Sequence, residues 1–262
     1  MKLSVSNIAW SADDDSRVYD LMKELGFCGL EIAPTRIFPE SPYDSLSEIA
    51  DFAGKIKEEY GFSICSMQSI WYGRQEKIFG TDEERDALCR YTQKAIDFAA
   101  AAGCGNLVFG CPRNRNLPDG CDTQKGVEFF KEIARYAEKK GTVIGMEANP
   151  PIYNTNFVNT TESAFELIEK VNSKAFALNL DLGTMIYNGE DLSVLSHRAE
   201  LINHVHISEP GLKAVEKREI HKRLADFLKS ASYNNYVSIE MGSAAGLDSV
   251  ESAMRYVKEI FE

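Results

Sequence analysis

Four short apolar segments in the second half of the chain each end on a side chain that can bind a metal ion. In chain order, at intervals of 34, 25 and 34 residues, these end residues are Glu147, Asp181, His206 and Glu240. The preceding segments are rich in Val, Ile, Leu and Met, which is typical of buried parallel strands. Each interval has room for one helix. Because the C-terminal ends of such strands meet at one mouth of a closed barrel, we expect the four side chains to converge.

The same alternation of strand and helix extends over the rest of the chain. The other predicted strands are Lys2–Ile8, Phe27–Ile32, Phe62–Met67 and Asn106–Phe109. Strict alternation predicts a parallel sheet, either doubly wound or closed into a barrel. We favour a single (β/α)8 TIM barrel over residues 1–262. Eight units use the whole length, no linker divides the chain, and no glycine-rich dinucleotide turn follows a strand.

Helix starts are indicated by capping patterns. Ser45–Glu48 and Thr81–Glu84 have the spacing of a capping box, and Asp248–Glu251 predicts the start of the last helix. Between the Asp181 and His206 strands we place a helix at about 192–199.

Composition excludes several classes of protein. The net charge of −11 argues against a nucleic-acid partner, since binding to phosphates needs clustered Lys and Arg. No run of 18 apolar residues is present, which argues against a membrane span. The six cysteines include no CxxC pair and are typical of reduced thiols. The first residues do not form a secretory signal. We therefore expect a cytoplasmic enzyme.

Taken together, the four end residues favour a metal site over the simpler structural role that each could have on its own. A single acid at a strand end is often a helix cap, and a single histidine in a strand is often a core residue. Four such groups converging would be costly to bury unless paired or bound to metal. Three carboxylates and one imidazole suit one divalent ion, namely Mn²⁺, Zn²⁺, Co²⁺ or Mg²⁺. Such an ion, chelating a hydroxyl and an adjacent carbonyl, would acidify the C–H between them and stabilise an enediolate.

The whole chain also resembles a known superfamily. The motif Glu147, Asp181-Leu-Gly183, His204-Val-His206 and Tyr236-Val-Ser-Ile-Glu240 on eight βα units is similar to that of the xylose isomerase-like barrels. These include sugar isomerases and epimerases, inosose-type dehydratases and family-2 apurinic endonucleases. The resemblance implies a metal-dependent isomerase or epimerase acting on a ketose, polyol or sugar derivative. It implies that Glu147 and Glu240 exchange protons with the substrate as well as binding the metal. It also implies a possible homodimer.

The chain departs from the epimerase pattern at two positions. Thr184 stands three residues after Asp181, where epimerases of this group have a histidine, and Leu212 stands six residues after His206, where they have an arginine. Arg218 and His221 are candidates to replace these substrate contacts. The endonuclease branch binds three zinc ions and needs more histidines than the four in this chain.

Other residues at strand ends are candidates for substrate binding, and each also has a simpler structural explanation. Gln68 and Trp71 follow the third strand, and Trp71 would stack on a sugar ring or close the barrel rim. Glu31 and Asn149 would bind hydroxyls or form turns. Arg113 and Arg115 would hold an acidic group or remain solvated.

Three other activities remain open from the sequence. A dehydratase acting on a keto-polyol would share the first proton transfer and then expel hydroxide. A metal-dependent phosphoesterase and a non-catalytic sugar-binding barrel are the further alternatives.

Overall fold

The eight predicted strands pair in chain order, and the last pairs with the first. The computed structural model describes residues 1–262. All pairs are parallel and the sheet is closed, which confirms the (β/α)8 barrel. The strands are β1 (Lys2–Ser6), β2 (Gly29–Ile32), β3 (Ser63–Met67), β4 (Asn106–Phe109), β5 (Val143–Met146), β6 (Phe176–Asp181), β7 (Ile202–Ile207) and β8 (Tyr236–Ile239).

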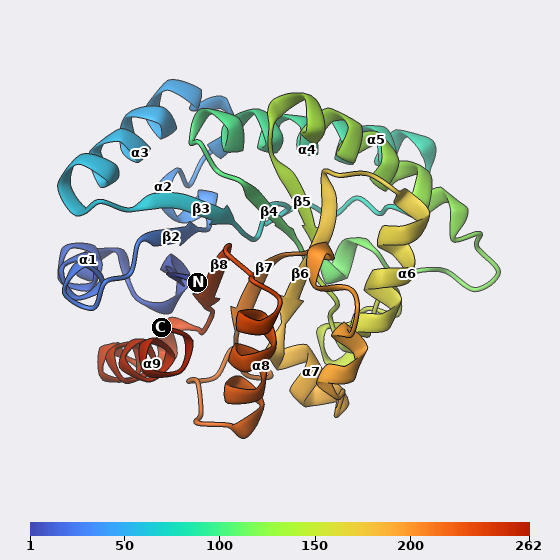
Figure 1. The fold of residues 1–262 in the computed structure, drawn as a ribbon. Helices are drawn as coiled ribbons and strands as arrows, with labels where there is room; N and C mark the ends of the chain where they lie inside the picture. Colours follow the sequence, from blue (N-terminus) through green and yellow to red (C-terminus); the bar gives the residue numbers. More distant parts are fainter.

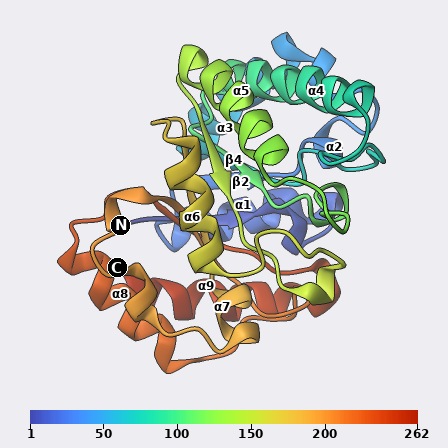
Figure 2. The same cartoon turned by 90° about the vertical axis from the view of Figure 1, so that its right-hand side faces the viewer.

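Helices surround this barrel, and the two ends of the chain lie close together in both views (Figures 1 and 2). They are α1 (Asp15–Glu24), α2 (Pro34–Ile37), α3 (Leu46–Tyr60), α4 (Asp82–Ala101), α5 (Gln124–Lys140), α6 (Thr161–Val171), α7 (Leu182–Asn188), α8 (Glu219–Ser230) and α9 (Leu247–Phe261). No helix in the chain combines the length and apolar character that crossing a bilayer would need.

Alternation along the strands gives the closed sheet an apolar outer face and a polar inner face. Leu30, Leu180 and Val205 belong to the apolar core outside the barrel. Burying a side chain of this size contributes about 1.5–3 kcal/mol. The neighbouring positions, such as Glu31 and Asn179, are fully buried polar residues inside the barrel. The apolar outer face therefore stabilises the barrel, and the polar side chains lie on its inner face.

The predicted helix at 192–199 is wrong. Only 3₁₀ turns occur there, at Leu192–Leu195 and Ala199–Leu201. The helix of this unit is α7, which begins directly after β6, because the Asp181 side chain accepts a hydrogen bond from the Thr184 N–H and caps it. It ends at Gly189, which has a φ of 65°.

Of the three predicted caps, one is confirmed. Thr81 and Glu84 form a reciprocal capping box at the start of α4. Ser45 makes no side-chain cap, because its backbone lies outside the extended conformation that an N-cap residue needs. Asp248 lies inside the first turn of α9, whose N-cap residue is Gly246.

Candidate active site

The structure brings the four predicted metal ligands together at the C-terminal mouth of the barrel. Glu147 and Glu240 directly follow β5 and β8, Asp181 is the last residue of β6, and His206 lies near the end of β7. One ligand atom from each residue lies within 4.8 Å of the others. The Nδ1 atom of His206 is 3.0 Å from Glu147 Oε1 and 3.3 Å from Glu240 Oε2.

The two glutamates are held unequally. Glu147 accepts hydrogen bonds from the side-chain amides of Asn149 and Asn179, each at 2.9 Å. The Glu240 carboxylate has only the His206 ring as a side-chain partner. Asn149 is held in turn by Arg115, which donates to its Oδ1 at 2.9 Å. Glu147 is therefore a fixed group, whereas Glu240 is free to change its interactions.

Asp181 is anchored from two sides. Its Oδ1 accepts from the Thr184 N–H at 2.6 Å, and its Oδ2 accepts from the Ser208 hydroxyl. One carboxylate thus begins α7 and also faces the cluster. The cap fixes its direction without using any atom of Glu147 or Glu240.

Burial and crowding of charge control protonation at the site. Burial raises the pKa of Glu240 to about 7, and the adjacent His206 opposes this shift. Burial, followed by the charge of Glu147, raises the pKa of Asp181 to about 6. The pKa of His206 lies well above its ordinary value: burial lowers it, but the carboxylates of Glu31 and Glu240 outweigh that effect. The cluster carries more negative charge than one imidazolium balances, and its oxygen-rich donor set fits a divalent cation.

A cavity of about 540 Å³ opens above the cluster, within the range of small-molecule sites. Glu147, Asp181 and Glu240 line it, together with the loops after β3, β4 and β7. Most of the residues that line it are polar or charged, which suits a hydroxylated ligand.

Three of the predicted substrate contacts line this cavity. They are Gln68, Trp71 and Asn149. The Gln68 amide donates to Ser6 Oγ at 2.7 Å, and the Trp71 indole N–H donates to Thr92 Oγ1 at 2.9 Å. Trp71 is 3% exposed, so it offers little surface for stacking on a sugar.

The other three predicted contacts do not line the cavity. Glu31 is completely buried inside the barrel, next to the histidines of β7. Arg218 forms two hydrogen bonds of 2.7 Å to Glu209, and it is Glu209 that lines the cavity. His221 is buried on α8, with its Nδ1 3.1 Å from the Tyr256 hydroxyl.

His221 leads to a prediction about stability. Burial lowers its pKa to about 4, so protonation favours the unfolded chain, in which the ordinary value is near 6.5. Its neutral form contributes fully above pH 6.5, and the contribution is lost as the pH falls towards 4. We expect the free energy of unfolding, measured with urea, to fall between pH 7 and pH 4.5 by about 2–3 kcal/mol less in His221→Gln than in the wild type. The matched control is His197→Gln, on an exposed turn, and an equal change in both variants would contradict the prediction.

Arg115 binds the protein itself and is not available to a substrate. It is fully buried, and its guanidinium donates to the backbone carbonyls of Glu147 and Val158 as well as to Asn149. Arg113 is exposed and lines the cavity.

Two residues at the site escaped the sequence analysis. Asn179 contacts both Glu147 and His206, and Glu209 is a nearly buried carboxylate at the cavity wall. Asn179 lies two residues before Asp181 on the same strand face, and that spacing was its only signal.

Known proteins with this architecture include several sugar epimerases. No curated protein matches the sequence. Among solved structures, D-psicose 3-epimerase from Clostridium cellulolyticum H10 is similar at 15% identity and a TM-score of 0.81, covering 100% of both chains. The E. coli 3-keto-D-glucoside 4-epimerase is 18% identical, with a TM-score of 0.76 and 99% of both chains covered. The IOLI protein with a bound zinc atom is 18% identical, with a TM-score of 0.71, covering 99% of this chain and 94% of that one. The family described as xylose isomerase-like TIM barrel matches residues 19–260, and the chain therefore belongs to this family.

Proposed function

We propose that the protein is a metal-dependent sugar isomerase or epimerase that transfers a proton at a carbon next to a carbonyl. The observation that carries this proposal is the pair of glutamates at one cavity, both near His206 and held to different degrees. Epimerisation needs one group to remove the proton and a second to return a proton on the opposite face of the carbon. The epimerases among the similar structures support the same class of reaction.

The roles of the four residues follow from how each is held. Asp181 and His206 are fixed by the chain and would hold the cation with the two glutamates. A bound divalent ion would polarise the hydroxyl and carbonyl oxygens of a sugar. Glu240, whose carboxylate has only the His206 ring as a side-chain partner, is the better general base, because a loosely held carboxylate retains more of its affinity for a proton. Glu147, which two side-chain amides hold in place, is the second group of the acid–base pair.

Thr184 and Leu212 do not supply the polar substrate contacts that the epimerase pattern has at these two positions. The Thr184 hydroxyl donates to the Ala148 carbonyl at 2.8 Å, so its proton is not available to a substrate. Leu212 lines the cavity with an apolar side chain. The contacts that would select one sugar therefore differ from those of the epimerase pattern at both positions.

The first test is the metal content of the purified protein beside a His206→Ala variant. We expect about one equivalent of Mn²⁺, Zn²⁺ or Co²⁺ in the wild type and a large loss in the variant, since an imidazole ligand is removed. Loaded wild type incubated with ketoses in D₂O should then exchange a substrate C–H proton. A protein that binds no divalent ion would overturn the proposal. A bound ion with sugar binding but no exchange would indicate a binding protein, and an absorbing enone product would indicate a dehydratase.

A further inference from the structure

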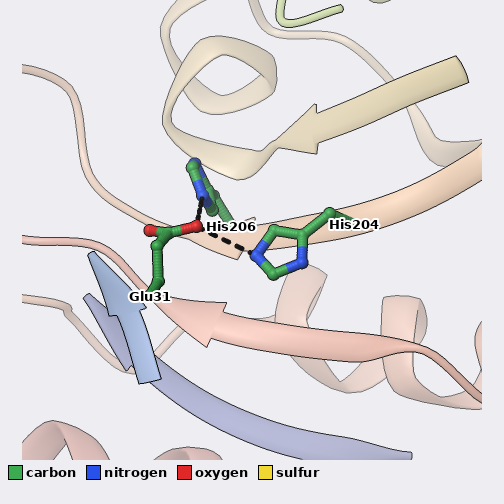
Figure 3. A group of neighbouring side chains, drawn as sticks. All are labelled: Glu31, His204 and His206. Atoms are coloured by element: carbon green, nitrogen blue, oxygen red, sulfur yellow. Dashed lines mark hydrogen bonds and ion pairs between the residues drawn. The ribbon is translucent and has the colours of Figure 1, made fainter. Parts of the chain in front are cut away.

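A second group of titratable side chains lies inside the barrel, next to the candidate metal ligands. Glu31 on β2 reaches across to His204 and His206 on β7 (Figure 3). Its Oε2 atom is 3.1 Å from His204 Nε2 and 2.9 Å from His206 Nε2. All three side chains are at most 1% exposed. A carboxylate this deeply buried is stable only with partners, so the contact with β7 is a structural requirement.

We infer that Glu31 is a positioning residue of the metal centre: it sets the orientation and tautomer of His206, and thereby presents the Nδ1 atom of that ring to the cation. The inference rests on the proposed metal site and adds a residue that would not itself be a ligand.

The orientation of the His206 ring supports this role. Its Nε2 points to Glu31, and its Nδ1 points to Glu147 and Glu240. A carboxylate can only accept a hydrogen bond, so Nε2 carries a proton that it donates to Glu31. By the same rule Nδ1 is protonated while it faces Glu147 and Glu240, and a cation bound by these carboxylates would take the place of that proton and use the Nδ1 lone pair. Histidine ligands of metals usually donate their other N–H to a carboxylate or carbonyl in this way.

Asn179 supports the same tautomer independently. Its Nδ2 donates to Glu147 Oε1 at 2.9 Å, which fixes the direction of the amide. The same nitrogen is 3.3 Å from His206 Nδ1. An amide nitrogen only donates, so this contact becomes a hydrogen bond to Nδ1 once the ring has lost its Nδ1 proton, which is the form that binds a cation.

Glu31 has partners that hold it in place. Its Oε1 accepts from the Gln68 amide at 3.4 Å. His204 Nε2 lies 3.1 Å from Glu31 Oε2 but makes no well-aligned hydrogen bond. His206 is therefore the strongest partner of Glu31, and the negative charge of Glu31 makes the His206 ring a better electron donor to a cation.

Zinc affinity, measured by competition with a chromophoric chelator, tests the inference. Changing such a carboxylate partner of a metal ligand typically weakens binding about 10–100-fold, and we expect this loss in Glu31→Gln with one equivalent still bound. The absorption spectrum of the Co²⁺-loaded variant should also change, which loss of fold stability alone would not cause. Ser238→Ala is the matched control: Ser238 pairs with His206 in the sheet register and has no hydrogen-bond partner, so we expect unchanged affinity.

Nitrogen NMR of the zinc-loaded wild type gives a second readout that needs no variant to fold. We expect His206 to carry its proton on Nε2. An unprotonated Nε2, or full affinity with an unchanged cobalt spectrum in Glu31→Gln, would overturn the inference. So would a second zinc equivalent that Glu31→Gln removes, since Glu31 would then be a ligand itself. A wild type that binds zinc tightly but exchanges no substrate proton would refute the proposed function and leave this test intact.

Discussion

Glu240→Gln is expected to lower the turnover number of the metal-saturated enzyme by about 10²–10⁴-fold, the contribution typical of a general base. The substitution keeps the size of the side chain, and the only side-chain partner of the Glu240 carboxylate is His206. The fold should therefore be retained, as judged by circular dichroism and thermal unfolding. Glu216→Gln, at a residue whose side chain is 69% exposed, is the matched control and should keep wild-type turnover.

Glu147→Gln should lower turnover similarly for a different reason. Both carboxylate oxygens of Glu147 accept hydrogen bonds from amide groups, so a glutamine at this position would place its own NH₂ against another donor. Exchange of the substrate C–H proton in D₂O separates the two roles. We expect exchange to be lost in Glu240→Gln and to survive in part in Glu147→Gln. The reverse pattern would exchange the two assignments, and wild-type turnover in both variants would refute the acid–base pair.

The four strands of the second half were the most predictable, because two signals agreed in each of them. Apolar residues recur at strand spacing, and in the second half a metal-binding side chain marks each strand end. The helix after β6 was missed because its start depends on a local contact. Asp181 was interpreted as a metal ligand, whereas it also caps α7. The spacing of the strand ends indicated the first of these roles and gave no sign of the second.

The supporting residues of the site were harder to predict, because their roles depend on depth inside the barrel. Glu31 was expected to contact a substrate at the end of β2. It pairs with Ser6 and Ser66 within the sheet, whereas Glu147 and Glu240 lie beyond the last residues of their strands. This difference in level directs Glu31 towards the histidines of β7. Register across a barrel is set by all eight strands together, and one strand's sequence does not contain it.

Arg115 shows how the loops after β4 and β5 are tied to Glu147. Burial lowers the pKa of its guanidinium to about 10, which still leaves it charged at neutral pH. The charge is accommodated by several hydrogen bonds from its two terminal nitrogens. These bonds fix the backbone of Glu147 and the side chain of Asn149. Arg115 is therefore a support for the less mobile of the two glutamates.

Arg115→Met is accordingly expected to lower the free energy of unfolding by about 2–4 kcal/mol. The carbonyls of Glu147 and Val158 and the Asn149 Oδ1 would lose their donor, and each buried acceptor left unsatisfied costs about 1–3 kcal/mol, partly offset by removing a buried charge. Urea unfolding should show a lower midpoint with an unchanged slope. Arg115→Lys keeps the charge but not the planar fork, so it should recover only part of the loss. Full recovery in Arg115→Lys would show that charge, and not the hydrogen bonds, is what the site requires of Arg115. An unchanged midpoint in Arg115→Met would show that the two loops hold Glu147 in place without it.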